Sequence, residues 1–406
     1  MKSFLYHLKK PLSFIYDFSI SDFSLSLFIF NILLDPTNGM FHTKILTFAI
    51  ALFFNIKRMK FSLKAVFYLC IFYIGFTIST ALMMMRNINY DASFINMYST
   101  TFLTLILFFL DPNKININKS VNFSCICISI LILCFTFILI NFSVTVLFFE
   151  ENEKIKTMFM INRHKKVLFW WLPAVFHRAS PIIILAFGNQ LYTFLRQKHK
   201  KIKDFLCVNL FFWALFYTGT RANMFSVILI TGICYLDYVY YFKKQMFKFQ
   251  TLFVIGIAIA FLGVFLLLTV KNSSSSAKDG HIISYHELFS EHPSYLLIGQ
   301  GPGSWFYTKG FGKFATNTEL SYYELIRMFG GFFSILILAC YMSPFLYIRN
   351  IEKGKNIVIV MSYIAYLFIA GTNPLLIGPT GFMAWWITEN NLYKENKRLG
   401  TCSSKS

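Results

Sequence analysis

Two arginines lie at the edges of long hydrophobic runs, where little water is expected around their side chains. Arg221 lies in "YTGTRANMF", between two long hydrophobic runs with almost no loop between them, and Arg178 lies in "FHRASPIII", at the first turn of another run. The guanidinium group is a planar fork of five N–H donors that suits the oxygens of a diphosphate, and a charge at membrane depth is usually paired or functional. We therefore interpret Arg221 as a catalytic residue that holds a diphosphate and Arg178 as a substrate-binding residue beside it. The alternative is that both side chains only anchor their helices at the headgroups.

A carboxylate, Glu319, stands at the entrance of a later hydrophobic run. It lies in "NTELSYYELIRMFGG" and has no cation three or four residues away to pair with. A carboxylate held near a hydroxyl can accept its proton as a general base, so we interpret Glu319 as a second catalytic residue. The alternative is that Glu319 only begins a helix, with Asn317 or Thr318 as the cap and the helix dipole as its stabilisation.

The same stretch contains two features with a structural explanation. Glu324 and Arg327 are three residues apart, which places them on one face of a helix and predicts an ion pair between them. Gly330 and Gly331 follow within the hydrophobic run and predict a place where another segment packs closely.

A glycine-rich stretch, "HPSYLLIGQGPGSWF" at 292–306, precedes Glu319. Gly299, Gly301 and Gly303 form G-x-G-x-G without a following Lys-Ser/Thr and without a strand–loop–helix context, so both nucleotide-binding fingerprints are excluded. Glycines also permit tight turns, because they adopt positive φ without strain. The stretch therefore predicts a turn that shapes a loop over a cavity.

The composition indicates that transmembrane helices position the candidate site residues. Of 406 residues, 56% are hydrophobic and 14% charged, and the mean hydropathy of +0.57 excludes an ordinary soluble domain. Apolar runs of about 20 residues, the length that crosses about 30 Å of hydrocarbon, recur about twelve times. We expect an all-α polytopic integral membrane protein with about twelve transmembrane helices in a single transmembrane domain, 1–406. The expected spans are 13–34, 43–56, 62–85, 94–110, 121–149, 179–195, 204–220, 222–242, 250–270, 320–348, 356–373 and 376–393.

The charge distribution predicts how these spans are oriented. The net charge of +20 comes mainly from short Lys and Arg clusters on alternate loops, which favours membrane topology over nucleic-acid binding. Both termini are then cytoplasmic, and two long loops, 150–178 and 271–319, lie on the external side. The eight cysteines show no paired spacing, so neither a disulfide framework nor a metal site is indicated.

Four stretches of the second half, taken in order within residues 170–385, together resemble the bacterial O-antigen polymerase family and its relatives, the O-antigen ligases. They are "GTRANMFSVILI", "HPSYLLIGQGPGSWF", "NTELSYYELIRMFGG" and "GTNPLLIGPTGF". In the ligase pattern a His-Asn pair precedes a glycine by about eleven residues. Counting back from Gly330 places Glu319 at the His position and Leu320 at the Asn position, a departure that favours the polymerase. The family often has a basic residue before the glycine turn, for which Lys278 and His281 are the nearest candidates.

The resemblance implies a GT-C-like membrane glycosyltransferase of the bacterial inner membrane. Its substrate would be an oligosaccharide linked through diphosphate to a polyprenyl lipid, polymerised at the periplasmic face without a cofactor, and both long loops would be periplasmic. Lys278, His281, Gly301 and Gly303 would then join Arg178 in binding substrate. The implied partners are this lipid-linked oligosaccharide, the bilayer and a chain-length regulator protein. Two alternatives remain: the ligase, and a flippase that transports lipid-linked oligosaccharide.

Overall fold

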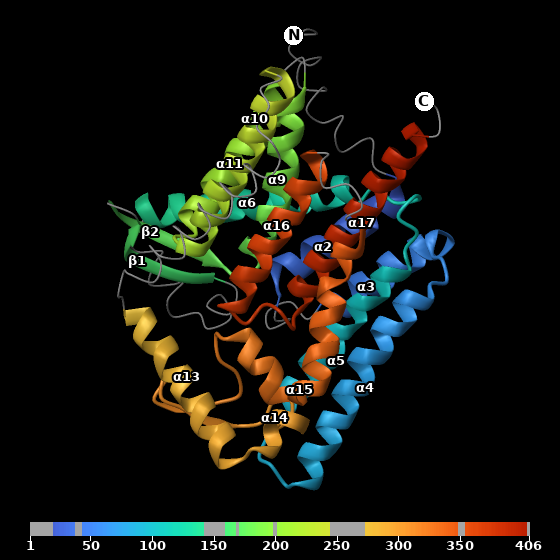
Figure 1. Cartoon of the computed structure of the whole chain (residues 1–406). Helices are drawn as coiled ribbons and strands as arrows, with labels where there is room; N and C mark the ends of the chain where they lie inside the picture. Colours follow the sequence, from blue (N-terminus) through green and yellow to red (C-terminus); the bar gives the residue numbers. More distant parts are fainter. Residues whose placement is uncertain are drawn as a thin grey trace.

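The structure, a computed structural model, describes residues 19–36, 43–141, 159–167, 170–197, 201–243, 273–347 and 354–403. Most of these residues are helical, and two short antiparallel hairpins complete the fold (Figure 1). The α-helices are α2 (Ile20–Leu34), α3 (Lys44–Asn55), α4 (Leu63–Met85), α5 (Ala92–Phe102), α6 (Ile117–Asn141), α9 (Ser180–Arg196), α10 (Ile202–Tyr217), α11 (Arg221–Lys243), α13 (Ser273–Glu291), α14 (Ser294–Ile298), α15 (Ser321–Met342), α16 (Gly354–Gly371) and α17 (Pro379–Ser403). The 3₁₀ helices are η1 (Ile56–Arg58), η2 (Leu103–Phe109) and η3 (Ser343–Tyr347), and the strands are β1 (Phe159–Val167), β2 (Trp170–His177), β3 (Phe306–Thr308) and β4 (Lys313–Ala315).

Within the described residues, five helical segments are long and apolar enough to cross a membrane. They are Leu63–Met85, Ala92–Phe109, Ile117–Asn141, Arg221–Val239 and Ser321–Tyr347. This number is smaller than the twelve or so spans predicted from the hydrophobic runs. Three of those runs form helices of only 12, 17 and 16 residues, namely α3, α9 and α10, which are shorter than the length of about 20 residues that crosses a bilayer. The predicted span 250–270 lies outside the described residues.

The two loops predicted to be external contain regular structure, so the all-α expectation is wrong there. The described part of 150–178 forms the hairpin β1–β2, and 271–319 contains α13, α14 and the hairpin β3–β4. Aromatic and β-branched residues are frequent in β1 and β2, and such residues favour extended backbone. Phe159 and Val175 of this hairpin pack against Phe135 and Leu139 of α6.

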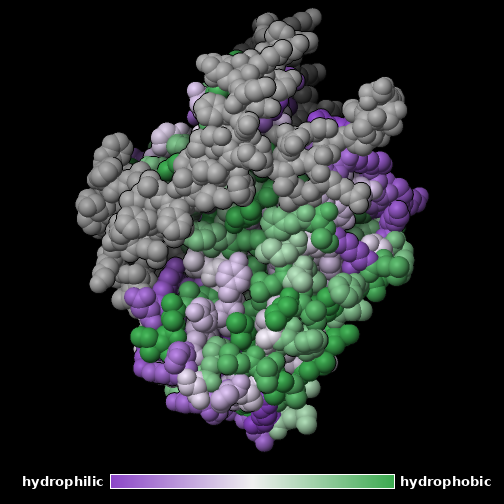
Figure 2. All heavy atoms as spheres, in the orientation of Figure 1, coloured by the Kyte–Doolittle hydropathy of each residue, from purple (hydrophilic) through white to green (hydrophobic). Residues whose placement is uncertain are grey.

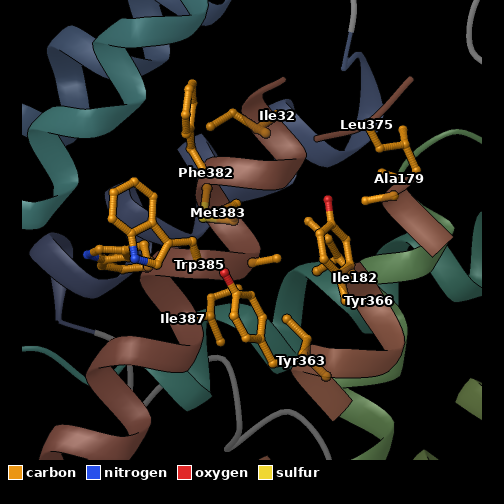
Figure 3. Close-up of a cluster of buried hydrophobic side chains, with 14 of the residues drawn as sticks. Ile32, Ala179, Ile182, Tyr363, Tyr366, Leu375, Phe382, Met383, Trp385 and Ile387 are labelled. Carbon is orange, nitrogen blue, oxygen red and sulfur yellow. The ribbon is translucent and has the colours of Figure 1, made fainter. Parts of the chain in front are cut away.

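The core is centred on the first half of α17, whose side chains are buried on all sides (Figure 3). Trp385 and Trp386 are completely buried, and each satisfies its indole N–H: Trp385 Nε1 donates to Ser343 Oγ at 3.0 Å, and Trp386 Nε1 to Leu107 O at 2.8 Å. Tyr363 of α16 packs in the same cluster and donates to Tyr341 O at 2.9 Å. Buried aromatic groups with satisfied polar atoms give a core with one defined packing.

Helix α15 lies within the predicted span 320–348 and has a kink at Gly330. Gly330 has φ 73° and ψ 171°, and the helix changes direction there, beside α14 (Figure 1). Only glycine adopts this backbone conformation readily. The first arm of α15 therefore runs in its own direction, and it begins at Ser321, two residues after Glu319.

The outer surface divides into apolar and polar parts. In Figure 2 hydrophobic side chains form a broad area over α4 and α15, and hydrophilic ones gather over α13. Phe67 and Ile74 of α4 are 58% and 50% exposed, and Phe332 and Ile335 of α15 are 65% and 69% exposed. Exposed apolar area of this kind suits contact with lipid. Helices α13 and α14 lie at the end of the molecule opposite the C-terminal end of α17 (Figure 1).

Candidate functional site

A cavity of about 540 Å³ lies where several helices begin or end. It is lined by Pro36, Phe94, Met97, Tyr98, Thr101, Phe176, Arg178, Phe311, Asn317, Thr318, Glu319, Ser321, Glu324, Met328, Asn373, Pro374, Leu375, Ile377, Gly378, Pro379 and Thr380. One part of this lining is aromatic and aliphatic, and another carries carboxylates, hydroxyls and amides. The volume and the mixed lining are typical of a site that binds a ligand with both apolar and polar parts.

Arg178 lines this cavity from the turn between β2 and α9. Burial lowers the pKa of its guanidinium, and the nearby Asp35 carboxylate raises it. Arginine remains charged under all physiological conditions, so the cavity holds a permanent positive charge that Asp35 compensates in part. Arg178 therefore lines a cavity, whereas Arg221, the residue beside which it is predicted to bind substrate, is not part of the described lining.

His177 fixes the turn that carries Arg178. Its ring is completely buried; Nδ1 accepts the Ala179 N–H at 3.2 Å, and Nε2 lies 3.2 Å from Leu34 O, to which it can only donate. These two contacts define the neutral Nε2–H tautomer. Burial lowers the pKa of His177 to about 4, which the adjacent Arg178 charge reinforces, while Leu34 O and Asp35 oppose the shift. His177 therefore joins the Arg178 turn to the end of α2 as an uncharged residue.

Glu319 lines the same cavity from the segment before α15. Its Oε2 lies 4.0 Å from Nζ of Lys278, and the two side chains are 41% and 32% exposed. Lys278 also donates to Thr372 O at 3.3 Å, so it contacts segments on both sides of the cavity. The sequence shows no local cation for Glu319, because its partner lies on α13, far away along the chain.

Two helices begin at the cavity, close to these side chains. Ser321 is the first residue of α15, and Pro379 and Thr380 are the first two of α17; all three line the cavity. Helix α9 begins two residues after Arg178. The unpaired N–H groups at a helix N-terminus carry partial positive charge and favour an anion. Together with Arg178, they make this part of the cavity suitable for an anionic group.

Gly301 and Gly303, predicted to bind substrate, are not among the residues that line this cavity. Both have positive φ, 116° and 73° respectively, and a Cβ on Gly303 would lie 2.9 Å from Cβ of Phe94. A Cβ on Gly301 would collide with the side chain of Met83. The predicted tight turn is confirmed, and its glycines allow the loop to pack against α4 and α5.

His281 and Arg221 also lie outside the cavity lining. The ring of His281 is completely buried and packs edge-on against Phe311, with Nδ1 2.5 Å from Thr308 Oγ1, and burial lowers its pKa. Arg221 begins α11 after the connection 218–220, whose shortness agrees with the sequence prediction. Asn223 Nδ2 donates to Ser180 Oγ at 3.2 Å, so the start of α11 is tied to the start of α9 near Arg178.

The predicted ion pair between Glu324 and Arg327 is confirmed. Arg327 Nη2 lies 2.8 Å from Glu324 Oε2, and both side chains are buried. The predicted close approach at Gly330 is also confirmed, because a Cβ there would collide with Leu297 O of α14.

Sequence reasoning missed a polar part of the site that the segment after α16 supplies. Asn373 and Thr380 line the cavity, and Asn373 O accepts a hydrogen bond from Ser321 Oγ at 2.5 Å. Both residues belong to the stretch "GTNPLLIGPTGF", which carries part of the resemblance. Its two prolines and three glycines are the signal that could have predicted a non-helical segment between two helices.

Chemically, the described lining of the cavity combines one cation, Arg178, and two carboxylates, Glu319 and Glu324, with two helix N-termini and apolar side chains. It can hold an anionic group near Arg178 and a polar group near Glu319, with a hydrophobic chain beside them. A search against known protein families finds no match for this sequence, and no curated protein matches it.

Proposed function

We propose that this protein is a membrane glycosyltransferase that polymerises oligosaccharide units carried on polyprenyl diphosphate, as the O-antigen polymerases do. The single observation that carries the proposal is that Arg178 and Glu319, which belong to two distant loops, line one cavity with the starts of α15 and α17. The apolar exterior and the five helices able to cross a membrane are compatible with a lipid-linked substrate.

The donor diphosphate binds near Arg178 in this proposal. Its negative charge increases as the sugar–oxygen bond breaks, and the guanidinium fork and helix N-termini stabilise that charge. The aromatic and aliphatic lining, with Phe94, Met97 and Phe176, offers contact area for the first part of the polyprenyl chain. Arg221, at the neighbouring helix start, completes a cationic clamp if its side chain turns toward the same diphosphate.

The acceptor hydroxyl binds near Glu319. The hydroxyl oxygen attacks the anomeric carbon of the donor sugar, and the bond from that carbon to the diphosphate oxygen breaks. The hydroxyl proton passes to the Glu319 carboxylate, and polyprenyl diphosphate leaves with the bonding electrons. The released diphosphate drives the reaction, so ATP is not required.

Purified protein in liposomes tests this proposal directly. Incubation with polyprenyl-diphosphate-linked oligosaccharide should yield a ladder of polymer on a gel, together with free polyprenyl diphosphate. A preparation that binds this substrate but never extends it would refute the polymerase proposal.

Loss of the gene separates the alternatives in a cell that makes O-antigen. Loss of a polymerase leaves lipopolysaccharide core with one repeat unit, loss of a ligase leaves core without any unit, and loss of a flippase leaves no surface unit. We expect the first pattern, and either of the other two would assign the protein to the corresponding alternative.

A further inference from the structure

The buried charge of Arg327 is satisfied by acceptors from three separate stretches of chain. Nε and Nη2 donate to Glu324 Oε2 at 3.0 and 2.8 Å, and Nη2 also donates to Thr316 O at 2.6 Å. Nη1 donates to Gln300 Oε1 at 2.8 Å and to Ser304 O and Oγ at 3.0 and 2.7 Å. A buried charge is tolerated only with such complete pairing, so Arg327 fixes the glycine turn and the segment before Glu319 on the first arm of α15.

Glu324 extends this network to α13 through its second oxygen. Oε1 accepts the Tyr285 hydroxyl at 2.5 Å and the Thr318 N–H at 2.8 Å, while Oε2 accepts from Arg327. Each carboxylate oxygen therefore accepts two hydrogen bonds, and little capacity remains for a substrate. Although Glu324 lines the cavity, its role in this arrangement is structural.

The network ends at the residues on either side of Glu319. Thr318 donates its N–H to Glu324, and its Oγ1 lies 2.7 Å from the Tyr285 hydroxyl. The Leu320 N–H donates to the same Thr318 Oγ1 at 3.2 Å. The backbone is thus held immediately before and immediately after Glu319, whereas the Glu319 side chain is 41% exposed and contacts only Lys278 at 4.0 Å among the charged side chains described.

We infer that Tyr285 is a positioning residue, which holds the backbone of Glu319 so that its carboxylate faces the reacting hydroxyl. This inference rests on the proposed function and adds a residue to it that lies outside the cavity. The Tyr285 hydroxyl is the one group of the network that joins α13 to both Glu324 and Thr318 within the described residues. Burial raises the pKa of Tyr285 well above its usual value, and the Glu324 carboxylate adds to the shift, so the hydroxyl stays protonated and donates.

Tyr285→Phe tests the inference with little disturbance of packing. The ring stacks with Tyr323 and packs at a tilt against Phe306, at centroid distances of 5.2 and 5.3 Å, and Phe keeps these contacts while the hydroxyl is removed. Tyr323→Phe is the matched control. Tyr323 stacks on Tyr285, and the Tyr323 hydroxyl makes no hydrogen bond within the described residues.

We expect Tyr285→Phe to lower kcat for polymerisation about ten- to hundredfold, with the KM for the lipid-linked donor unchanged within about twofold. Tyr323→Phe should match the wild type in both constants. In a Glu319→Gln background, Tyr285→Phe should cost less than about threefold, because a residue that acts through Glu319 has nothing left to position. Thermal unfolding in detergent should be the same for Tyr285→Phe and Tyr323→Phe within a few degrees.

Four results would overturn the inference. Equal kcat for Tyr285→Phe and Tyr323→Phe would show that the hydroxyl does not matter, and an equal loss with and without Glu319 would show a general structural role. A large loss of thermal stability in Tyr285→Phe would also show a general structural role. In that case Thr318→Val, which removes the hydroxyl that pairs with Tyr285, should lose thermal stability as well. If the wild-type protein binds lipid-linked units but never joins them, both the proposed function and the inference fail. If the wild type polymerises, the proposed function holds, and the Tyr285→Phe result tests the inference by itself.

Discussion

The two ends of the cavity are held in contrasting ways. Arg178 is held by a neighbour, His177, whose ring hydrogen-bonds, among the described residues, to the backbone groups Leu34 O and Ala179 N–H. Glu319 is held by side chains in a buried network that includes one complete ion pair, Glu324 with Arg327. The first arrangement depends on the protonation state of one histidine. The second depends on long-range contacts among α13, the glycine turn and α15, so the two ends should respond differently to pH and to mutation.

The largest effect is expected at the carboxylate end. Glu319→Gln keeps the size of the side chain but cannot accept a proton as a carboxylate does, and it should lower kcat about 10²- to 10⁴-fold in the liposome assay. Glu287→Gln is the control, because Glu287 is an exposed residue of α13 that pairs with Lys309. Polymerisation by Glu319→Gln at close to the normal rate would assign proton removal to another group.

The next effect is expected at the arginine end. Arg178→Ala should lower kcat about 10²- to 10³-fold by removing charge stabilisation from the leaving diphosphate, and Arg178→Lys should recover little because the bidentate fork is lost. Arg221→Ala should lose less, since Arg221 does not line the cavity. A greater loss for Arg221→Ala than for Arg178→Ala, measured in the same liposomes, would restore Arg221 to the leading role that the sequence suggested.

A third effect, on stability, is expected from His177 at the arginine end. The pKa of His177 is about 4 in the folded protein and 6.5 by its ordinary value, so the unfolded chain binds a proton more readily between these limits. Stability should therefore fall as the pH decreases below about 6.5 and level off near pH 4, by about 3 kcal/mol in total. Thermal unfolding across this range measures the loss. His177→Gln, which can donate and accept but not titrate, should reduce this dependence, and an unchanged dependence would assign it to other groups.

The smallest effect is expected from the exposed pair between Lys278 and Glu319. At 4.0 Å and about a third exposed, such a pair contributes little, so Lys278→Gln should change kcat by less than about threefold. The rate of the wild type should vary with ionic strength more than that of Lys278→Gln, because salt screens this pair. A loss comparable to that of Glu319→Gln would instead show that Lys278 contacts substrate, as the resemblance implies.

The sequence predicted the features that depend on short spacings. The Glu324–Arg327 pair, the tight turn at 299–303 and the short connection before Arg221 follow from residues close together in the chain. The network partner Tyr285, the contact of Lys278 with Glu319 and the role of His177 depend on packing between distant segments, which spacing does not reveal. Among the described residues, fewer helices are long enough to cross a membrane than the apolar runs predict, because several of these runs form short helices. Hydropathy alone does not distinguish a buried helix from one that faces lipid.

The break in α15 has a consequence for how this sequence can vary. A Cβ on Gly299 would lie 2.6 Å from Met328 O and 2.7 Å from Gly330 N, and a Cβ on Gly330 would meet Leu297 O. Both obstacles are backbone atoms, which no change of a neighbouring side chain can remove, and both glycines also have positive φ. Neither position can therefore be rescued by a compensating substitution elsewhere. Descendants of this protein that keep the loop packed on the broken helix should inherit both glycines together, and those that lose one should have lost this loop arrangement as well.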